Sequence, residues 1–281
     1  MIIDRNENKE VIALLGAGGM GVAIIKKFAA GKKILLGDIS QAKLDEVAKD
    51  FTYLGYDVEC MIVDGCSKEA VEAFASRAAT LGPVMYFVDS AGASPSQGKP
   101  EHIINLDLIG TSYAIDAFGK VMARGGSGLI IASQTGYMGP NYDRETEDLL
   151  ALTPTEKLKD LPMLQGIERS GAAYILAKYV NQLRVRTAAA TTWAQRGARI
   201  NTISPGIIMT PVACDEFQSP GNTYQNMIDQ SPARRVGTVD EIARAGEFLL
   251  SPLSGFITGI DLLIDGGVIA SLKSGKYALG K

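Results

Sequence analysis

The sequence has few residues that could build a metal site or a disulfide framework. Its 281 residues contain three cysteines, Cys60, Cys66 and Cys214, and one histidine, His102. Such a low count excludes a disulfide-stapled scaffold and a zinc site made of cysteine and histidine ligands. Three mostly reduced thiols suit a reducing compartment. We therefore expect no bound metal and a cytoplasmic location.

The chain also lacks a large excess of one charge and a long hydrophobic run. Its 28 Lys and Arg and 31 Asp and Glu give a net charge of −3, which offers no general attraction for nucleic acid or an anionic membrane. The longest uncharged run, Gly125–Tyr142, is rich in Gly, Ser, Thr and Gln, and Met1–Glu10 is charged and polar. Neither segment resembles a membrane span or a signal peptide. We expect a protein that binds neither nucleic acid nor membrane.

Short apolar segments alternate with longer amphipathic segments almost from end to end. The apolar segments are rich in Val, Ile and Leu, and they are Val11–Leu15, Lys33–Gly37, Val58–Val63, Val84–Val88, Leu129–Ala132, Arg199–Ile203 and Asp261–Ile264. The helix-length segments include Gln41–Tyr53, Lys68–Leu81, Leu106–Ala123 and Ala172–Gln195. This alternation predicts an α/β fold with a Rossmann-type, doubly wound parallel sheet of about seven strands. Since no linker divides the chain, residues 1–281 are expected to form a single domain.

Two irregular stretches, residues 137–169 and 207–232, interrupt the alternation. Both follow predicted strands on the side where open α/β sheets bind ligands, and long insertions in compact domains are often functional lids. We expect a lid over the substrate. Its inner face would use the apolar residues Tyr137, Met138, Leu149, Leu150, Leu152, Leu161, Met163, Leu164, Met209, Val212, Phe217 and Met227. The alternative is that these side chains pack the insertions onto the body or into a subunit interface.

A glycine-rich loop follows the first predicted strand and opens a helix. Gly16, Gly18 and Gly21 have the G-x-G-x-x-G spacing, with Gly19 and Met20 inside it. The first glycine allows a tight turn, the second allows a pyrophosphate to approach the backbone, and the third allows close packing of helix on strand. The free N–H groups of the helix then face the phosphates. Although glycine clusters also mark plain turns, the strand–turn–helix context favours dinucleotide binding.

Asp38 ends the second predicted strand, about 20 residues after the glycine loop, where an acidic side chain binds the adenosine ribose. A carboxylate there repels a 2′-phosphate, so we expect NAD, with NADP possible because Lys32 and Lys43 are close in sequence. The alternative role for Asp38 is a helix cap.

Four polar residues are candidates for catalysis. Tyr174 and Lys178 stand at i and i+4 of a helical segment and so project from one face. A tyrosine works as an acid–base near neutral pH only if a cation such as the lysine stabilises its phenolate. Ser133 follows an apolar strand and Asn105 opens a helix. Taken singly, each of these residues has a structural alternative: a surface pair, a strand-end cap or a helix cap.

Taken together and in order, these residues resemble the short-chain dehydrogenase/reductase family over almost the whole chain. The matching motifs are Gly16–Gly21, Asp64, Ser90-Ala91-Gly92, Asn105-Leu106, Ser133-x-x-Gly136, Tyr174-x-x-x-Lys178, Ser204-Pro205-Gly206 with Thr210-Pro211, and Ile257-Thr258-Gly259 with Asp265-Gly266-Gly267. Three features depart from the family pattern: a glycine loop one residue shorter, Asp89 in place of the first motif asparagine, and a 41-residue separation of Ser133 and Tyr174.

The resemblance implies a role for each matching residue. Tyr174 would be the catalytic acid–base, Ser133 would hold the substrate oxygen, and Lys178 would lower the tyrosine pKa and bind the nicotinamide ribose. Asn105 would hold a water in the proton relay from Lys178. The remaining cofactor contacts would come from Asp64 at the adenine, Ala91 and Gly92 beside the ribose, and Pro205, Gly206, Ile207 and Thr210 at the nicotinamide.

The resemblance also implies an activity: an NAD(P)-dependent oxidoreductase that moves a hydride between nicotinamide and a secondary alcohol or ketone. The long insertion is similar to that of bacterial hydroxysteroid dehydrogenase/carbonyl reductases, which suggests a hydroxysteroid or similar bulky alicyclic substrate and a homodimer or homotetramer. The alternatives are a broad carbonyl reductase or a 3-oxoacyl-type reductase. From another class, a non-catalytic dinucleotide-binding regulator is possible because the fold hosts many functions.

Overall fold

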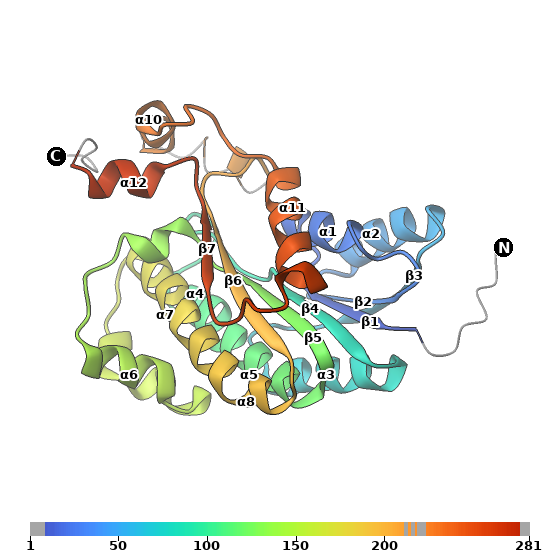
Figure 1. Cartoon of the computed structure of the whole chain (residues 1–281). Helices are drawn as coiled ribbons and strands as arrows, with labels where there is room; N and C mark the ends of the chain where they lie inside the picture. The colour runs from blue at the N-terminus through green and yellow to red at the C-terminus, as the bar shows by residue number, and fades with distance from the viewer. Residues whose placement is uncertain (1–8, 211–212, 215–216, 218–222, 276–281) are drawn as a thin grey trace.

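The protein folds around one parallel sheet of seven strands (Figure 1). The computed structural model describes residues 9–210, 213–214, 217 and 223–275. The strands are β1 (Val11–Leu15), β2 (Lys33–Asp38), β3 (Asp57–Ile62), β4 (Val84–Asp89), β5 (Met122–Ile131), β6 (Arg199–Pro205) and β7 (Asp261–Ile264). Their order is β3-β2-β1-β4-β5-β6-β7, and every neighbouring pair is parallel. The predicted Rossmann-type, doubly wound single domain is confirmed.

Helices cover both faces of the sheet. They are α1 (Gly19–Lys26), α2 (Gln41–Tyr53), α3 (Lys68–Leu81), α4 (Pro100–Ile103), α5 (Thr111–Val121), α6 (Arg144–Leu152), α7 (Ser170–Ala190), α8 (Thr192–Gln195), α10 (Thr223–Gln230), α11 (Val239–Leu250) and α12 (Val268–Lys273). Buried residues of α3, α5 and α7 share one hydrophobic cluster with the strands, and those of α1, α2 and α11 share another. Strand order reverses between β1 and β4, so the carboxyl ends of these two strands form the crevice where such sheets bind ligands.

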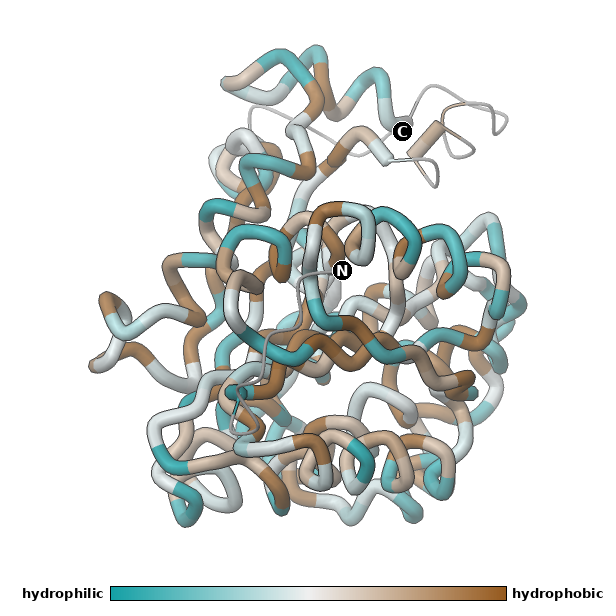
Figure 2. The backbone as a smooth tube through the Cα atoms, turned by 90° about the vertical axis from the view of Figure 1, so that its right-hand side faces the viewer, coloured by the Kyte–Doolittle hydropathy of each residue, from teal (hydrophilic) through white to brown (hydrophobic). Residues whose placement is uncertain are grey.

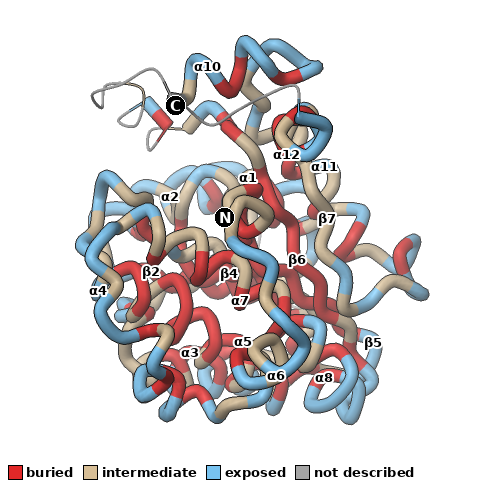
Figure 3. Tube along the Cα trace, turned by 90° about the vertical axis from the view of Figure 1, so that its left-hand side faces the viewer, coloured by how far each residue is buried: buried red, intermediate tan, exposed pale blue. Residues whose placement is uncertain are grey.

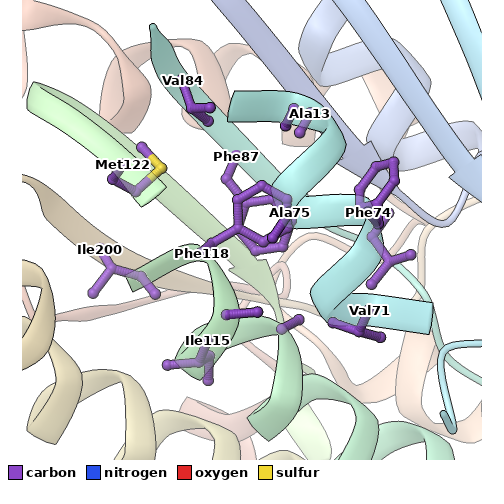
Figure 4. Packing of buried hydrophobic residues seen from close by; sticks show 14 of the residues in the cluster. Ala13, Val71, Phe74, Ala75, Val84, Phe87, Ile115, Phe118, Met122 and Ile200 are labelled. Carbon is purple, nitrogen blue, oxygen red and sulfur yellow. The ribbon is translucent and has the colours of Figure 1, made fainter. Parts of the chain in front are cut away.

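The core beneath α3 and α5 is aromatic. The rings of Phe87 on β4 and Phe118 on α5 stack with centroids 3.6 Å apart, and Phe74 of α3 meets Phe118 edge-on (Figure 4). Hydrophobic stretches lie in the interior and hydrophilic ones on the outer turns (Figure 2). Buried residues are concentrated along the strands (Figure 3). This rigid layer fixes the strand ends that carry the candidate site.

Most predicted elements are shifted by a few residues, and two differ more strongly for identifiable reasons. β5 begins at Met122 rather than Leu129 because its irregular first half, with Gly125 at φ +83°, still pairs with β4. The helix predicted over residues 106–123 instead comprises a π-helical segment, Ile104–Gly110, followed by α5. Single π-helical turns are rare and often occur at functional sites.

The first irregular stretch, residues 137–169, packs in part onto the body of the domain. It contains α6, and its Leu150, Leu158, Leu161 and Leu164 are buried in a cluster with residues of α4 and α7. α6 lies beside α7, whereas α10 and α12 lie beyond the carboxyl ends of β6 and β7 (Figure 1). Leu150, Leu161 and Leu164 therefore pack onto the body, whereas Leu149 and Leu152 are exposed, and a lid formed by this stretch stays a prediction.

The second stretch, residues 207–232, does lie at the carboxyl edge of the sheet. Its Ile207 and Met227 are buried together with Val268 of α12, and Met138 and Phe217 pack against them. Val212 lies outside the described residues. A lid formed by this stretch stays a prediction.

Arg184 of α7 holds the insertion in place, which leads to a stability prediction. Its buried guanidinium donates hydrogen bonds to the carbonyl of Thr153 at 2.9 Å and to Thr155 Oγ1 at 2.8 Å. We expect Arg184→Met to lower the free energy of unfolding by about 2–4 kcal/mol, since buried acceptors lose a charged donor. Denaturant unfolding measures this effect, and Arg186→Met is the matched control. Arg186 is exposed, so its pair with Glu147 should contribute at most about 1 kcal/mol. Equal effects of the two substitutions would contradict the assignment.

Candidate active site

The glycine loop has the backbone that close packing demands. Gly16 adopts φ +83°, and a Cβ built there would lie 2.3 Å from the Ala91 backbone nitrogen. A Cβ on Gly21 would lie 2.6 Å from Leu14 Cδ1, so this glycine lets α1 approach β1. A Cβ on Gly18, by contrast, would meet nothing within 4 Å. The turn and packing roles predicted for the first and third glycines are confirmed, and the second glycine faces open space at the start of α1.

Asp38 lies under this loop at the end of β2. Its carboxylate accepts hydrogen bonds from the backbone N–H groups of Ala17 and Ser40, each at 2.9 Å, and is almost fully buried. Lys43 Nζ lies 3.9 Å from the same carboxylate. Asp38 therefore braces the glycine loop, which sequence reasoning did not anticipate, in addition to marking the predicted ribose position.

The loop after β4 runs beside the glycine loop. Ser90 Oγ donates a hydrogen bond to the Gly16 carbonyl at 2.6 Å, so the two loops are joined at the switch point of the sheet. A Cβ on Gly92 would lie 2.7 Å from Asp107 Oδ1 and 3.4 Å from Lys178 Nζ. Only glycine lets this loop pass so close to the lysine. Asp64 is exposed beyond β3 and accepts a hydrogen bond from the Cys66 N–H.

Tyr174 and Lys178 lie one turn apart near the start of α7, as predicted. Lys178 Nζ is 5.3 Å from the centre of the Tyr174 ring. The lysine is 3% exposed, and its Nζ donates to the Ile131 carbonyl at the end of β5, 3.4 Å away. α7 therefore delivers both side chains to the carboxyl edge of the sheet.

An unpredicted residue, Asp107 of the π-helical segment, forms the ion pair with Lys178. Its Oδ1 lies 2.8 Å from Lys178 Nζ, and neither side chain is appreciably exposed. Asn181 of α7 donates to the Asp107 carbonyl at 2.9 Å and fixes this segment against the helix. Burial lowers the pKa of Lys178, but Asp107 and Tyr174 outweigh that effect and raise it above its ordinary value.

Asn105 lines a cavity of about 310 Å³ with Lys159 and Glu168, and Asp107, two residues further on, pairs with Lys178. The proton-relay role of Asn105 stays a prediction. The π-helical geometry of this segment sets which side chain faces α7. A single charged residue within the apolar run Ile103–Ile109 was the sequence signal for Asp107.

A second buried carboxyl group acts electrostatically on the lysine. Asp89, at the end of β4, is 2% exposed and accepts a hydrogen bond from the Ala91 N–H at 3.1 Å. Burial raises its pKa to about 7, although Lys178 and the hydrogen bond act in the opposite direction. The departure from the family motif at this position therefore places an ionisable group in the interior of the site.

Ser133 follows β5 and caps a short 3₁₀-helix, Gln134–Tyr137. Its Oγ accepts a hydrogen bond from the Thr135 N–H at 3.2 Å, which leaves the hydroxyl hydrogen as a donor. A Cβ on Gly136 would lie 3.1 Å from the backbone of Lys178, so this turn is packed directly on α7. The serine, tyrosine and lysine thus belong to two elements in close contact.

The loop after β6 completes the carboxyl edge. Gly206 N–H donates to the Ile264 carbonyl at 2.8 Å, and a Cβ on Gly206 would lie 2.6 Å from Asp265 Cα. Ile207 lines a small cavity of about 80 Å³ beside these residues, and the Thr210 hydroxyl accepts a hydrogen bond from the Ala213 N–H. Pro205 is the last residue of β6. The contacts of these four residues with the nicotinamide stay a prediction.

The arrangement suits a dinucleotide. The open space at Gly18, the free N-terminus of α1 and the carboxylate of Asp38 line up along the β1–β2 half of the crevice.

Within the described ranges, no three His, Cys, Asp or Glu side chains are placed to hold a metal ion. In the same part of the chain, no helix is long and apolar enough to cross a bilayer.

Known proteins share this sequence and fold. A family model described as short chain dehydrogenase matches residues 10–142, and one described as enoyl-(acyl carrier protein) reductase matches residues 163–269. The short-chain dehydrogenase/reductase bsc3 of Alternaria brassicicola is 38% identical over 94% of this chain and 97% of its own. The galactitol 2-dehydrogenase (L-tagatose-forming) of Cereibacter sphaeroides is 31% identical over 91% of this chain and 93% of its own.

Solved structures agree on the fold. Levodione reductase superposes with a TM-score of 0.74 at 23% identity, covering 94% of this chain and 99% of its own. A short-chain dehydrogenase/reductase from Serratia marcescens gives 0.73 at 20% identity, covering 94% and 98%. Sequence, sheet order and strand-end geometry lead to one conclusion: this chain belongs to the short-chain dehydrogenase/reductase family, whose members are NAD(P)-dependent oxidoreductases acting on CH–OH groups.

Proposed function

We propose that the protein interconverts a secondary alcohol and a ketone with NAD as the preferred nucleotide. The observation that carries the proposal is the Tyr174–Lys178 pair on α7, with the ammonium held by a buried carboxylate beside the turn that bears Ser133. A non-catalytic nucleotide-binding regulator would need neither a buried ammonium beside a tyrosine nor a serine donor next to it.

Each residue has a distinct task in this reaction. The Ser133 hydroxyl donates a hydrogen bond to the substrate oxygen, and Tyr174 removes the hydroxyl proton during oxidation or supplies it during reduction. Lys178 stabilises the phenolate that forms when Tyr174 gives up its proton. When bound, the nicotinamide accepts or donates the hydride, and Gly16–Gly21, Asp38, Gly92 and the Pro205–Thr210 loop would hold the nucleotide.

For the substrate, the named relatives favour alcohols with neighbouring oxygen functions. Besides galactitol 2-dehydrogenase, a D-threitol dehydrogenase from Mycolicibacterium smegmatis is 28% identical over 94% of this chain. We therefore propose a polyol or alicyclic diol, and keep the hydroxysteroid as the alternative. A panel of polyols, cyclic diols, hydroxysteroids and 3-oxoacyl thioesters, followed by nicotinamide absorbance with NAD and NADP, tests the choice. If the protein turns over none of these compounds with either nucleotide, the proposed function is contradicted.

Asp38 gives a prediction for cofactor choice. We expect Asp38→Asn to lower kcat/KM for NAD by about tenfold or more, because the amide cannot accept both backbone N–H bonds. The variant also no longer repels the 2′-phosphate of NADP. The NAD-to-NADP ratio of kcat/KM should narrow. The control is Lys43→Met, which removes a half-exposed cation near the carboxylate and should widen the ratio. A wild-type preference for NADP would contradict the role of Asp38 in cofactor choice.

A further inference from the structure

The surroundings of Lys178 contain more negative charge than a single tyrosine partner would supply. The charged and titratable groups that face its ammonium are Asp107 from the π-helical segment, Asp89 from β4 and Tyr174 from its own helix. Asp107 is completely buried and Asp89 is 2% exposed. Buried carboxylates are costly unless they are paired, so their presence beside one lysine requires an explanation.

The contacts of Asp107 require a carboxylate rather than an amide. One oxygen, Oδ2, accepts a hydrogen bond from the Ala93 N–H at 3.0 Å, while Oδ1 lies 2.8 Å from Lys178 Nζ. Both neighbours are donors, and an asparagine has only one acceptor oxygen. Asp107 therefore ties the lysine to the loop after β4, whose Gly92 lies against the same ion pair.

We propose that Asp107 is a positioning residue that holds the Lys178 ammonium beside Tyr174 and offsets part of its charge, and that the nearby buried Asp89 adds a smaller electrostatic contribution. As a result, Tyr174 ionises at a higher pH than it would beside an unpaired lysine. The inference rests on the proposed function of Tyr174 as the acid–base. It assigns an electrostatic task to two residues that neither bind substrate nor transfer a proton in that function.

The two carboxylates oppose the effect of the lysine on Tyr174. A cation beside Tyr174 favours the phenolate and lowers the tyrosine pKa, whereas an anion on the far side of that cation weakens the effect. Screening by water is small because Lys178 and both carboxyl groups are buried. Removing the charge of Asp107 leaves Asp89 facing the ammonium, which keeps the lysine charged. The pKa of Tyr174 should then fall.

The experiment measures the ionisation of Tyr174 in two independent ways. The first is the phenolate absorbance of each protein against pH, from which the absorbance of the same protein carrying Tyr174→Phe is subtracted. This measurement needs neither substrate nor nucleotide. The second is the acid limb of kcat/KM against pH for alcohol oxidation with the best substrate of the panel. Both are measured for the wild type, Asp107→Asn, Asp89→Asn and the control Asp50→Asn. Asp50 is an exposed carboxylate near the end of α2.

We expect Asp107→Asn to lower both midpoints by about 1 pH unit or more. Asp89→Asn should lower them by a smaller amount, and Asp50→Asn should leave them unchanged. A loss of thermal stability with unmoved midpoints would show that the carboxylates are purely structural and would overturn the inference. If Asp107→Asn does not fold, an unmoved midpoint in Asp89→Asn overturns it equally. Should Tyr174→Phe stay active, the proposed function fails instead, so the two failures are distinguishable.

Discussion

Replacing Tyr174 with phenylalanine is expected to reduce kcat by a factor of about 10²–10⁴ or more, because a positioned acid–base group contributes about that much. The ring remains to pack among the residues of α7 and its neighbours, and the Lys178–Asp107 ion pair does not involve the lost hydroxyl. Nucleotide affinity and the melting temperature should therefore stay close to those of the wild type. Turnover by nicotinamide absorbance, nucleotide binding by fluorescence titration and thermal unfolding measure the three quantities.

Tyr179→Phe is the matched control for this substitution. Tyr179 lies on the same helix, but its hydroxyl donates to Glu147 of α6, away from the carboxyl edge of the sheet. We expect it to retain nearly full turnover. A Tyr174→Phe protein with more than roughly a tenth of the wild-type kcat would refute the acid–base assignment, and equal losses in the two variants would show that α7 had been disturbed.

The sheet could be predicted from the sequence because its determinants are local. β1 and β7 have the predicted bounds, since each is a short apolar run flanked by turn residues. The helix caps Ser40 and Ser67 begin α2 and α3 at the predicted residues. Gly16 and Gly21 were recognised for the same reason: a left-handed φ and a close helix–strand contact leave glycine as the only suitable residue.

The contacts inside the site depend on long-range packing, which the sequence does not reveal. Asn105 matched the expected residue type, but the π-helical segment turns Asp107 to Lys178, and no local pattern in the sequence announces that segment. Leu150 and Leu164 have the apolar character of a substrate-facing surface, and the structure places both in the buried cluster beside α7. Periodicity reports that a side chain is apolar, and only the tertiary structure decides which surface it covers.

The strongest effect on stability is expected from Lys178→Met. The substitution leaves the Asp107 and Asp89 carboxyl groups buried without their cation, and breaking a buried ion pair on one side costs about 3–5 kcal/mol. The same substitution should also abolish turnover, since the phenolate of Tyr174 loses its stabilising charge. The matched control is Lys120→Met. Its ammonium is exposed, and its pair with Glu72 at 3.2 Å should contribute about 1 kcal/mol at most.

The destabilisation by Lys178→Met should depend on pH with a sign that follows from the buried carboxyl groups. Without the lysine, both buried carboxyl groups lose the cation that favours their charged form, so burial favours their protonation and the folded variant binds more protons than its unfolded chain. The loss of stability is then fully present at pH 8 and shrinks as the pH falls towards 4. Adding Asp107→Asn removes one stranded charge and should restore part of the stability at pH 8, because the amide oxygen can still accept the Ala93 N–H. Denaturant unfolding of the wild type, the single variant and the double variant at pH 5 and pH 8 measures both effects. A loss that is the same at both pH values, with no gain in the double variant, would mean that Lys178 stabilises the fold through packing of its alkyl chain and not through the ion pair.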